Sequence, residues 1–171
     1  MSDTGIYRLG ARPALLGEVR NAWLGAMYVW NDVAIRHLGL HGFGMDPAQH
    51  KRIWNAHHHV KMPGHEIIVL LSTMDYAIAR AKDRRQVVAA LARYGQQHPR
   101  SNLGTQARII REASLEDGDF IAWLGTSAGN YWFLSRSENE DPPRFYDPRQ
   151  ETKHFDIVAE ALAYSKEESA T

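Results

Sequence analysis

The stretch EIIVLLSTMDYAI, residues 66–78, begins with the chain's longest run of branched aliphatic residues, Ile67 to Leu71. A continuous run of this kind is typical of a strand that is buried on both faces of a sheet. We therefore expect a central strand here, which can begin to turn from Met74 onward. No apolar run in the chain approaches the roughly 20 residues of a membrane-spanning helix, so no membrane partner is expected.

Helical patterns lie on both sides of this stretch. Before it, apolar residues recur at three- and four-residue steps after Pro13, namely at Leu16, Val19, Trp23, Met27, Trp30, Ala34 and Leu38. This spacing predicts a helix. Gly17 and Gly25 either divide it into two helices or let it pack closely against a neighbour.

Four further helices and one turn are predicted from local signals. Asp46 and Gln49 flank a capping-box pattern that begins a short helix reaching about Asn55, after a turn at residues 42–44. The other helices are expected from Asp83 to Gly95, from Ser101 to Ala113 and from His154 to Tyr164. In each of them the apolar residues form one stripe.

Two short aromatic-rich runs, Phe120 to Leu124 and Tyr131 to Leu134, are separated by GTSAGN, which is typical of a β-hairpin. A third strand is expected at residues 144–146, after Pro142 and Pro143. The mixture of helices and short strands predicts an α+β fold. We expect one domain over residues 1–171, with a small, mainly antiparallel sheet packed against several helices.

The formal net charge of zero conceals two oppositely charged parts. Residues 1–111 carry fifteen Lys and Arg against seven Asp and Glu, a formal charge of +8, whereas residues 112–171 carry five against thirteen, a formal charge of −8. The chain has no cysteine, which excludes thiol catalysis, cysteine-ligated zinc and iron–sulfur clusters and fits a reducing compartment. We expect a cytoplasmic protein without a cofactor.

Histidines crowd the segment before the aliphatic run, at His50, His57, His58, His59 and His65. If residues 57–59 are extended, His57 and His59 point the same way, with His65 and Glu66 as further metal ligands. This arrangement is loosely similar to the His-x-His and Glu set of cupins. His57, His59 and His65 are therefore metal candidates, although no complete ligand set is defined. The alternative is a solvated or pH-responsive polar loop.

GTSAG at residues 125–129 resembles the serine motif of patatin-like lipid acyl hydrolases. In such an elbow a strand turns sharply into a helix and exposes the serine hydroxyl, which would make Ser127 a nucleophile. A turn built from small residues explains Ser127 equally well. No catalytic residue is assigned.

Basic residues raise a nucleic-acid hypothesis, but they are dispersed over several elements, and no recognition motif accompanies them. They are Lys51, Arg52, Lys61, Arg80, Lys82, Arg84, Arg85, Arg93, Arg100, Arg108 and Arg111. We do not expect a nucleic-acid partner.

YWFLSRSENEDPPRFYD, at residues 131–147, resembles the late segment of the SUKH superfamily, in which a tryptophan-containing strand precedes an acidic turn, a D-P-P run, a short strand and a closing helix. Many members of that superfamily are similar to immunity proteins of bacterial toxin systems. The resemblance implies a non-enzymatic protein that binds a cognate toxin and occludes it. The expected binding residues are Trp132, Glu138, Glu140, Asp141 and Arg144.

An acidic face with embedded aromatic residues suits this role, because charge speeds the encounter with a basic cleft and aromatic residues supply anchor area. An acidic rim that only confers solubility is the plain alternative. The enzyme alternatives are a metal protein using the histidine cluster and a hydrolase using Ser127.

Overall fold

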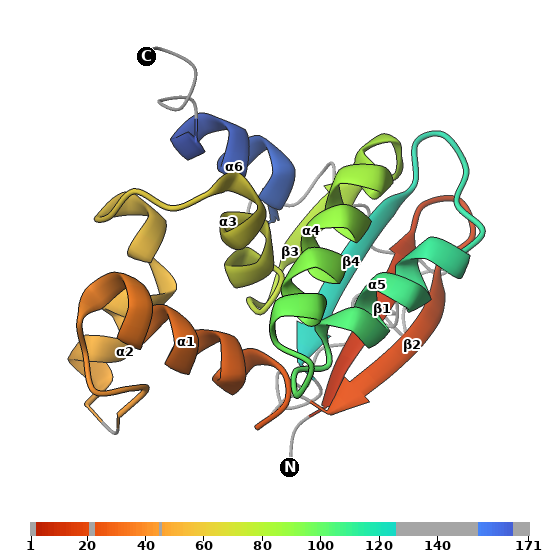
Figure 1. The fold of residues 1–171 in the computed structure, drawn as a ribbon. Coiled ribbons are helices and arrows are strands. Elements are labelled where there is room, and N and C mark those ends of the chain that lie inside the picture. The colour runs from red at the N-terminus through yellow and green to blue at the C-terminus, as the bar shows by residue number, and fades with distance from the viewer. Residues whose placement is uncertain (1–2, 21–22, 45, 126–153, 166–171) are drawn as a thin grey trace, which may run out of the picture.

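A computed structural model describes residues 3–20, 23–44, 46–125 and 154–165 of the chain (Figure 1). The fold is α+β, as predicted. Its strands are β1 (Asp3–Leu9), β2 (Ala14–Arg20), β3 (Ala77–Arg80), β4 (Phe120–Gly125) and β5 (Phe155–Asp156). Its α-helices are α1 (Ala26–Leu38), α2 (Pro47–Trp54), α3 (Gly64–Leu71), α4 (Arg84–Gln97), α5 (Leu103–Glu112) and α6 (Ile157–Ser165), and its 3₁₀ helices are η1 (Ala56–His58) and η2 (Ala81–Asp83).

The five strands form one sheet in the order β2-β1-β4-β3-β5. The pairs β1–β2, β1–β4 and β3–β4 are antiparallel, and β3–β5 is parallel. The prediction of a small, mainly antiparallel sheet is therefore confirmed.

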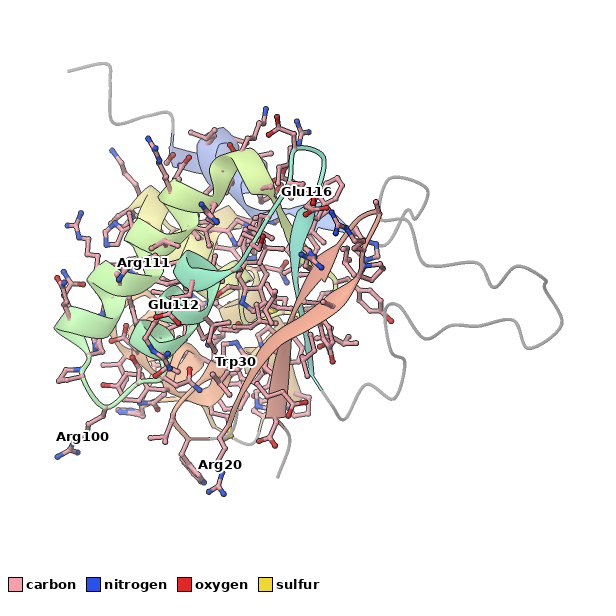
Figure 2. The ribbon with its side chains drawn as sticks, turned by 90° about the vertical axis from the view of Figure 1, so that its right-hand side faces the viewer. Arg20, Trp30, Arg100, Arg111, Glu112 and Glu116 are labelled. Carbon is pink, nitrogen blue, oxygen red and sulfur yellow. The ribbon has the colours of Figure 1, made fainter. Side chains whose placement is uncertain are left out.

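Both faces of the sheet carry apolar side chains, because successive apolar residues of a strand point to opposite faces. On β4, Ile121 and Trp123 join the core that the helices share, whereas Ala122 and Leu124 belong to a second cluster with Tyr7 of β1. Among the described residues, no helix contributes to that second cluster. Figure 2 shows the helices gathered on one side of the sheet.

The aliphatic run is a helix, so the predicted central strand at residues 66–78 is wrong for its first part. Helix α3 begins after Pro63, and its residues Glu66 to Leu71 are all buried. A helix surrounded by other elements is apolar on every side, so periodicity cannot distinguish it from a buried strand. The strand β3 follows after a turn in which Tyr76 adopts a left-handed conformation, with φ 69°.

The first predicted helix is also partly wrong, because Ala14–Arg20 is the strand β2 and only Ala26–Leu38 is helical. The N-terminal strand β1 was not predicted; it pairs with β2 through an irregular register between Ile6 and Tyr7. A Cβ on Gly17 would lie 2.9 Å from Ile109 Cδ1. Gly17 therefore allows the close packing against a neighbour that the sequence suggested, but from a strand.

The predicted capping signals are confirmed at α2 but not at α4. The Asp46 carboxylate accepts a hydrogen bond from the Ala48 amide at 3.0 Å, which confirms the predicted start of α2. Helix α4 begins after Asp83, although this side chain makes no capping hydrogen bond, and it runs past Gly95 to Gln97. The expectation that Gly95 ends the helix is wrong. Gly95 instead lies against the backbone of Gly104 on α5.

The end of the chain combines a short parallel strand, β5, with the helix α6, which begins three residues later than His154. The strands predicted at residues 131–134 and 144–146 lie outside the described residues. Within the described ranges, no helix has both the length and the apolar character needed to cross a membrane.

Candidate metal centre between η1 and α6

The three consecutive histidines are positioned by the end of α2. Asn55 donates from its side-chain amide to the Lys51 carbonyl at 2.8 Å, and the His58 amide donates to the Asn55 carbonyl at 3.0 Å, which starts the 3₁₀ turn η1. Helix α2 is held in place by aromatic packing. Trp54 lies edge-on to Trp30 of α1, with 5.6 Å between ring centroids.

Helix α6 brings a carboxylate to these histidines from a distant part of the chain. Asp156 Oδ1 accepts hydrogen bonds from the Val158 and Ala159 amides and so caps α6, while its other oxygen lies 3.2 Å from Arg80 Nε on β3. One turn along, α6 buries Ile157, Val158 and Ala161 and directs Glu160 to the histidines. Burial of these apolar residues therefore fixes the position of the Glu160 carboxylate beside the histidines.

The site consists of His57, His58 and Glu160. Glu160 Oε1 lies 3.5 Å from His57 Nε2 and 3.2 Å from His58 Nε2, and one potential ligand atom from each residue lies within 4.8 Å of the others. Tyr164, one turn beyond Glu160, stacks on the His58 ring at 4.6 Å and meets the His57 ring edge-on at 5.2 Å.

His57 is the most deeply buried member of the group, with 3% of its side chain exposed against 37% for His58 and 36% for Glu160. Its 3.5 Å contact with Glu160 is long for a hydrogen bond, and both of its ring nitrogens lack a hydrogen-bond partner among the described residues. Burial, together with the neighbouring His58, lowers the pKa of His57 against the opposing effect of the Glu160 carboxylate, which favours the neutral imidazole that binds metals.

The separations between Glu160 and each of the two histidines fit a small transition-metal ion. Two ligands bound at 2.0–2.1 Å to one tetrahedral zinc ion lie roughly 3.3–3.4 Å apart. The observed nitrogen–oxygen separations of 3.5 and 3.2 Å lie on either side of this value. Three protein ligands leave the fourth tetrahedral position for water or another molecule, as in zinc sites that act as Lewis acids.

Of the three predicted metal candidates, only His57 belongs to this site. Residues 57–59 are not extended, so His57 and His59 do not point the same way; the exposed His59 caps η1. His65 lies 4.0 Å from Glu66 on α3, which is a different cluster. Consecutive histidines on a 3₁₀ turn and a glutamate about a hundred residues later carry no joint local signal, which is why sequence reasoning missed His58 and Glu160.

Glu66, expected as a further metal ligand, belongs to a charged network that joins α1, α3 and α4. Arg36 on α1 reaches both carboxylate oxygens of Glu66 at 3.2 Å and also binds Asp32, one turn earlier. His37 Nε2 lies 2.6 Å from Glu66, and Tyr94 on α4 donates to Asp32 at 2.8 Å. The network pairs the carboxylates of Asp32 and Glu66 with cations and therefore links the three helices.

The network shifts the ionisation of its members. Burial alone would raise the pKa of Asp32, but hydrogen bonds from Arg36 and Tyr94 outweigh it and lower the pKa below its ordinary 3.8. Burial likewise opposes ionisation of Glu66, whereas Arg36 and His37 lower its pKa below 4.5. Burial and the Asp32 charge raise the pKa of Tyr94, which stays a hydrogen-bond donor.

The remaining predicted site residues, Ser127 and the partner-binding set Trp132, Glu138, Glu140, Asp141 and Arg144, lie outside the described residues. The basic residues occupy several elements, as expected. Arg100 points into solvent at the turn between α4 and α5 (Figure 2), whereas Arg108 pairs with Glu112 and Arg80 with Asp156.

Comparisons with known proteins add no relative: no protein family, curated protein or solved structure matches this chain.

Proposed function

We propose that this protein binds one divalent transition-metal ion, of the zinc type, through His57, His58 and Glu160. The single observation that carries the proposal is the buried His57, whose side chain is 3% exposed and whose Nε2 is directed at a carboxylate it does not hydrogen-bond. A buried polar atom without a partner costs about 1–3 kcal/mol. A bound ion would remove that cost by taking the nitrogen as a ligand.

The chemistry of the ligand set supports zinc. Imidazole suits zinc, copper, iron and nickel, whereas magnesium and calcium prefer oxygen ligands alone. Two histidines and one carboxylate are a known ligand set of hydrolytic zinc sites, and they also occur with ferrous iron in octahedral geometry. The two nitrogen–oxygen separations, 3.5 and 3.2 Å, support the tetrahedral case. In this proposal the ion cross-links η1 to α6 and keeps one position open.

Metal analysis tests the proposal directly. Protein purified without a tag is stripped with a chelator, reloaded with zinc and measured for metal content and for zinc affinity by calorimetry. We expect one zinc ion per chain, and a loss of affinity of at least roughly 100-fold in Glu160→Gln and in His58→Ala. His59→Ala, which changes the adjacent exposed histidine, is the matched control and should bind normally. Retention of zinc by a Glu160→Gln, His58→Ala double variant would refute the site.

A second candidate function is the toxin-neutralising role implied by the resemblance of residues 131–147 to the SUKH superfamily. The charge pattern favours it, because residues 112–171 carry thirteen acidic against five basic side chains. An acidic segment of this kind suits a basic partner, since opposite charge accelerates association. The proposed contact residues are Trp132, Glu138, Glu140, Asp141 and Arg144.

Co-expression with the product of a neighbouring gene tests this second role. If that product is a toxin, the intact chain should protect the cell and co-purify with it. Glu138→Lys combined with Asp141→Lys should reduce both protection and complex formation, because each change reverses a charge at the proposed face. Unchanged protection by the double variant would remove the proposed binding face.

A further inference from the structure

An open pocket of about 450 Å³ lies beside the proposed metal centre. One wall is the solvent side of α2, where Ala48, Lys51, Arg52 and Asn55 follow one another at helical spacing. The other wall is formed by His58 and His59. His58 therefore takes part in both the pocket and the metal cluster. The volume is within the range of about 300–1,000 Å³ that is usual for small-molecule sites.

The lining of this pocket is basic. Lys51 and Arg52 contribute two positive charges, Asn55 contributes an amide, and the two histidines add ring nitrogens; no acidic side chain among the described residues lines the pocket. A planar guanidinium beside an ammonium group matches an anion with several oxygen atoms, because each group donates to a different oxygen. The proposed zinc ion at His58 would add positive charge at the edge of the pocket that His58 forms.

We infer that this pocket binds a small phosphate-bearing molecule, held by Arg52 and Lys51 beside the metal ion. The inference rests in part on the proposed metal centre, because the ion contributes charge and an open coordination position. The pocket also carries its own positive charge, so phosphate binds more weakly, but measurably, to the metal-free protein. Binding of phosphate and binding of zinc strengthen each other by the same factor, as thermodynamic linkage requires.

Calorimetric titration of the full chain with inorganic phosphate, with and without one equivalent of zinc, tests this inference. Arg52→Gln and Lys51→Gln should each weaken phosphate binding roughly tenfold, as loss of one charge-assisted contact implies, while leaving zinc binding unchanged. Arg85→Gln is the matched control, because Arg85 is an exposed arginine on α4 that does not line the pocket. Circular dichroism checks that all variants are folded.

The outcomes separate the two proposals. Zinc binding without phosphate binding in either form would overturn the pocket inference and leave the metal centre intact. Phosphate binding that depends on Arg52, with no zinc binding, would support an anion pocket and refute the metal centre. Equal weakening in Arg52→Gln and Arg85→Gln would show nonspecific charge attraction and also overturn the pocket.

Glycerol 3-phosphate serves as a second probe that distinguishes free phosphate from a phosphate ester. Equal affinity for both probes would assign recognition to the phosphate group alone. Tighter binding of the ester would show that the pocket also contacts the organic part, and either result supports the inference.

Discussion

Arg36 and Glu66 form a two-pronged ion pair, with Nη1 to Oε1 and Nη2 to Oε2 both at 3.2 Å, across the contact between α1 and α3. Glu66 is nearly buried, with 10% of its side chain exposed, and Arg36 is the cation that binds both of its oxygens. The pair therefore stands between a surface ion pair and a fully buried one. Removing the Arg36 side chain therefore measures how much this ion pair contributes to the stability of the contact between α1 and α3.

Replacing Arg36 by Met should lower the free energy of unfolding by about 2 kcal/mol, because exposed pairs contribute roughly 0–1 kcal/mol and breaking a buried pair costs about 3–5 kcal/mol. Urea denaturation followed by circular dichroism measures the change. Arg108→Met is the matched control, since Arg108 pairs with Glu112 within α5 and both side chains are about 60% exposed. A loss of stability no larger than that of the control would show that the network does not stabilise the fold.

Acid should destabilise the protein through Asp32 and Glu66. Both folded-state pKa values lie below the ordinary values of 3.8 and 4.5, so the unfolded chain binds protons more readily than the folded one. Their stabilisation is fully present above the unfolded pKa values and is lost as the pH falls through the folded ones. The groups facing Asp32 are Arg36, Tyr94 and His98, and those facing Glu66 are Arg36, His37 and His65.

Urea denaturation between about pH 6 and pH 3 measures this effect. The free energy of unfolding of the native protein should fall across the lower half of that range. The double variant Asp32→Asn, Glu66→Gln should start less stable at pH 6 and show a flatter profile. Parallel profiles for the two proteins would contradict the assignment of acid sensitivity to these carboxylates.

Gly95 allows α4 to lie close against the backbone of Gly104 on α5. A Cβ on Gly95 would lie 2.6 Å from the Gly104 nitrogen and 2.9 Å from its Cα, both of them backbone atoms that cannot rotate away. Gly95→Ala should therefore destabilise the protein by about 1–3 kcal/mol, as overpacking does. Thermal denaturation measures the effect.

The second glycine of this contact provides the control. A Cβ on Gly104 meets nothing within 4 Å, and its position in the first turn of α5 is helical. Gly104→Ala should leave the stability unchanged or raise it by up to about 1 kcal/mol, because alanine is the better helix former. The contact as described would be wrong if both substitutions had the same effect.

Zinc should stabilise the folded protein. A ligand that binds only the folded state adds about 2.7 kcal/mol at a free concentration one hundred times its dissociation constant. The melting temperature should therefore rise with zinc and return to its starting value with excess chelator. Glu160→Gln should lose the response, whereas His59→Ala should keep it. An equal rise in both variants would place the zinc elsewhere.

Much of the fold could be predicted from local signals. Residues 103–112 form a helix because apolar residues repeat every three or four positions and bury one face, and Asp46 with Pro47 begins α2 for a local reason of hydrogen bonding. Phe120 to Leu124 forms a strand as expected. These elements need only their own residues to specify them.

Two elements were predicted wrongly, and each error has a physical reason. The part of α3 from Glu66 to Leu71 is buried on all sides, which removes the periodicity that separates a helix from a strand. Ala14 to Arg20 has helix-like apolar spacing but pairs with β1, since a sheet partner and close packing at Gly17 outweigh propensity.

The sequence by itself determined the α+β class, the presence of helices at α2, α4, α5 and α6, and the crowding of histidines before α3. Only the tertiary structure decided which histidines meet a carboxylate. His58 meets Glu160 of α6, and Arg36 meets Glu66 of α3. These distances depend on how apolar faces pack rather than on residue spacing. The sequence specifies which side chains can bind a metal or form an ion pair. Which of them lie close together depends on how the helices and the sheet pack to bury their apolar residues.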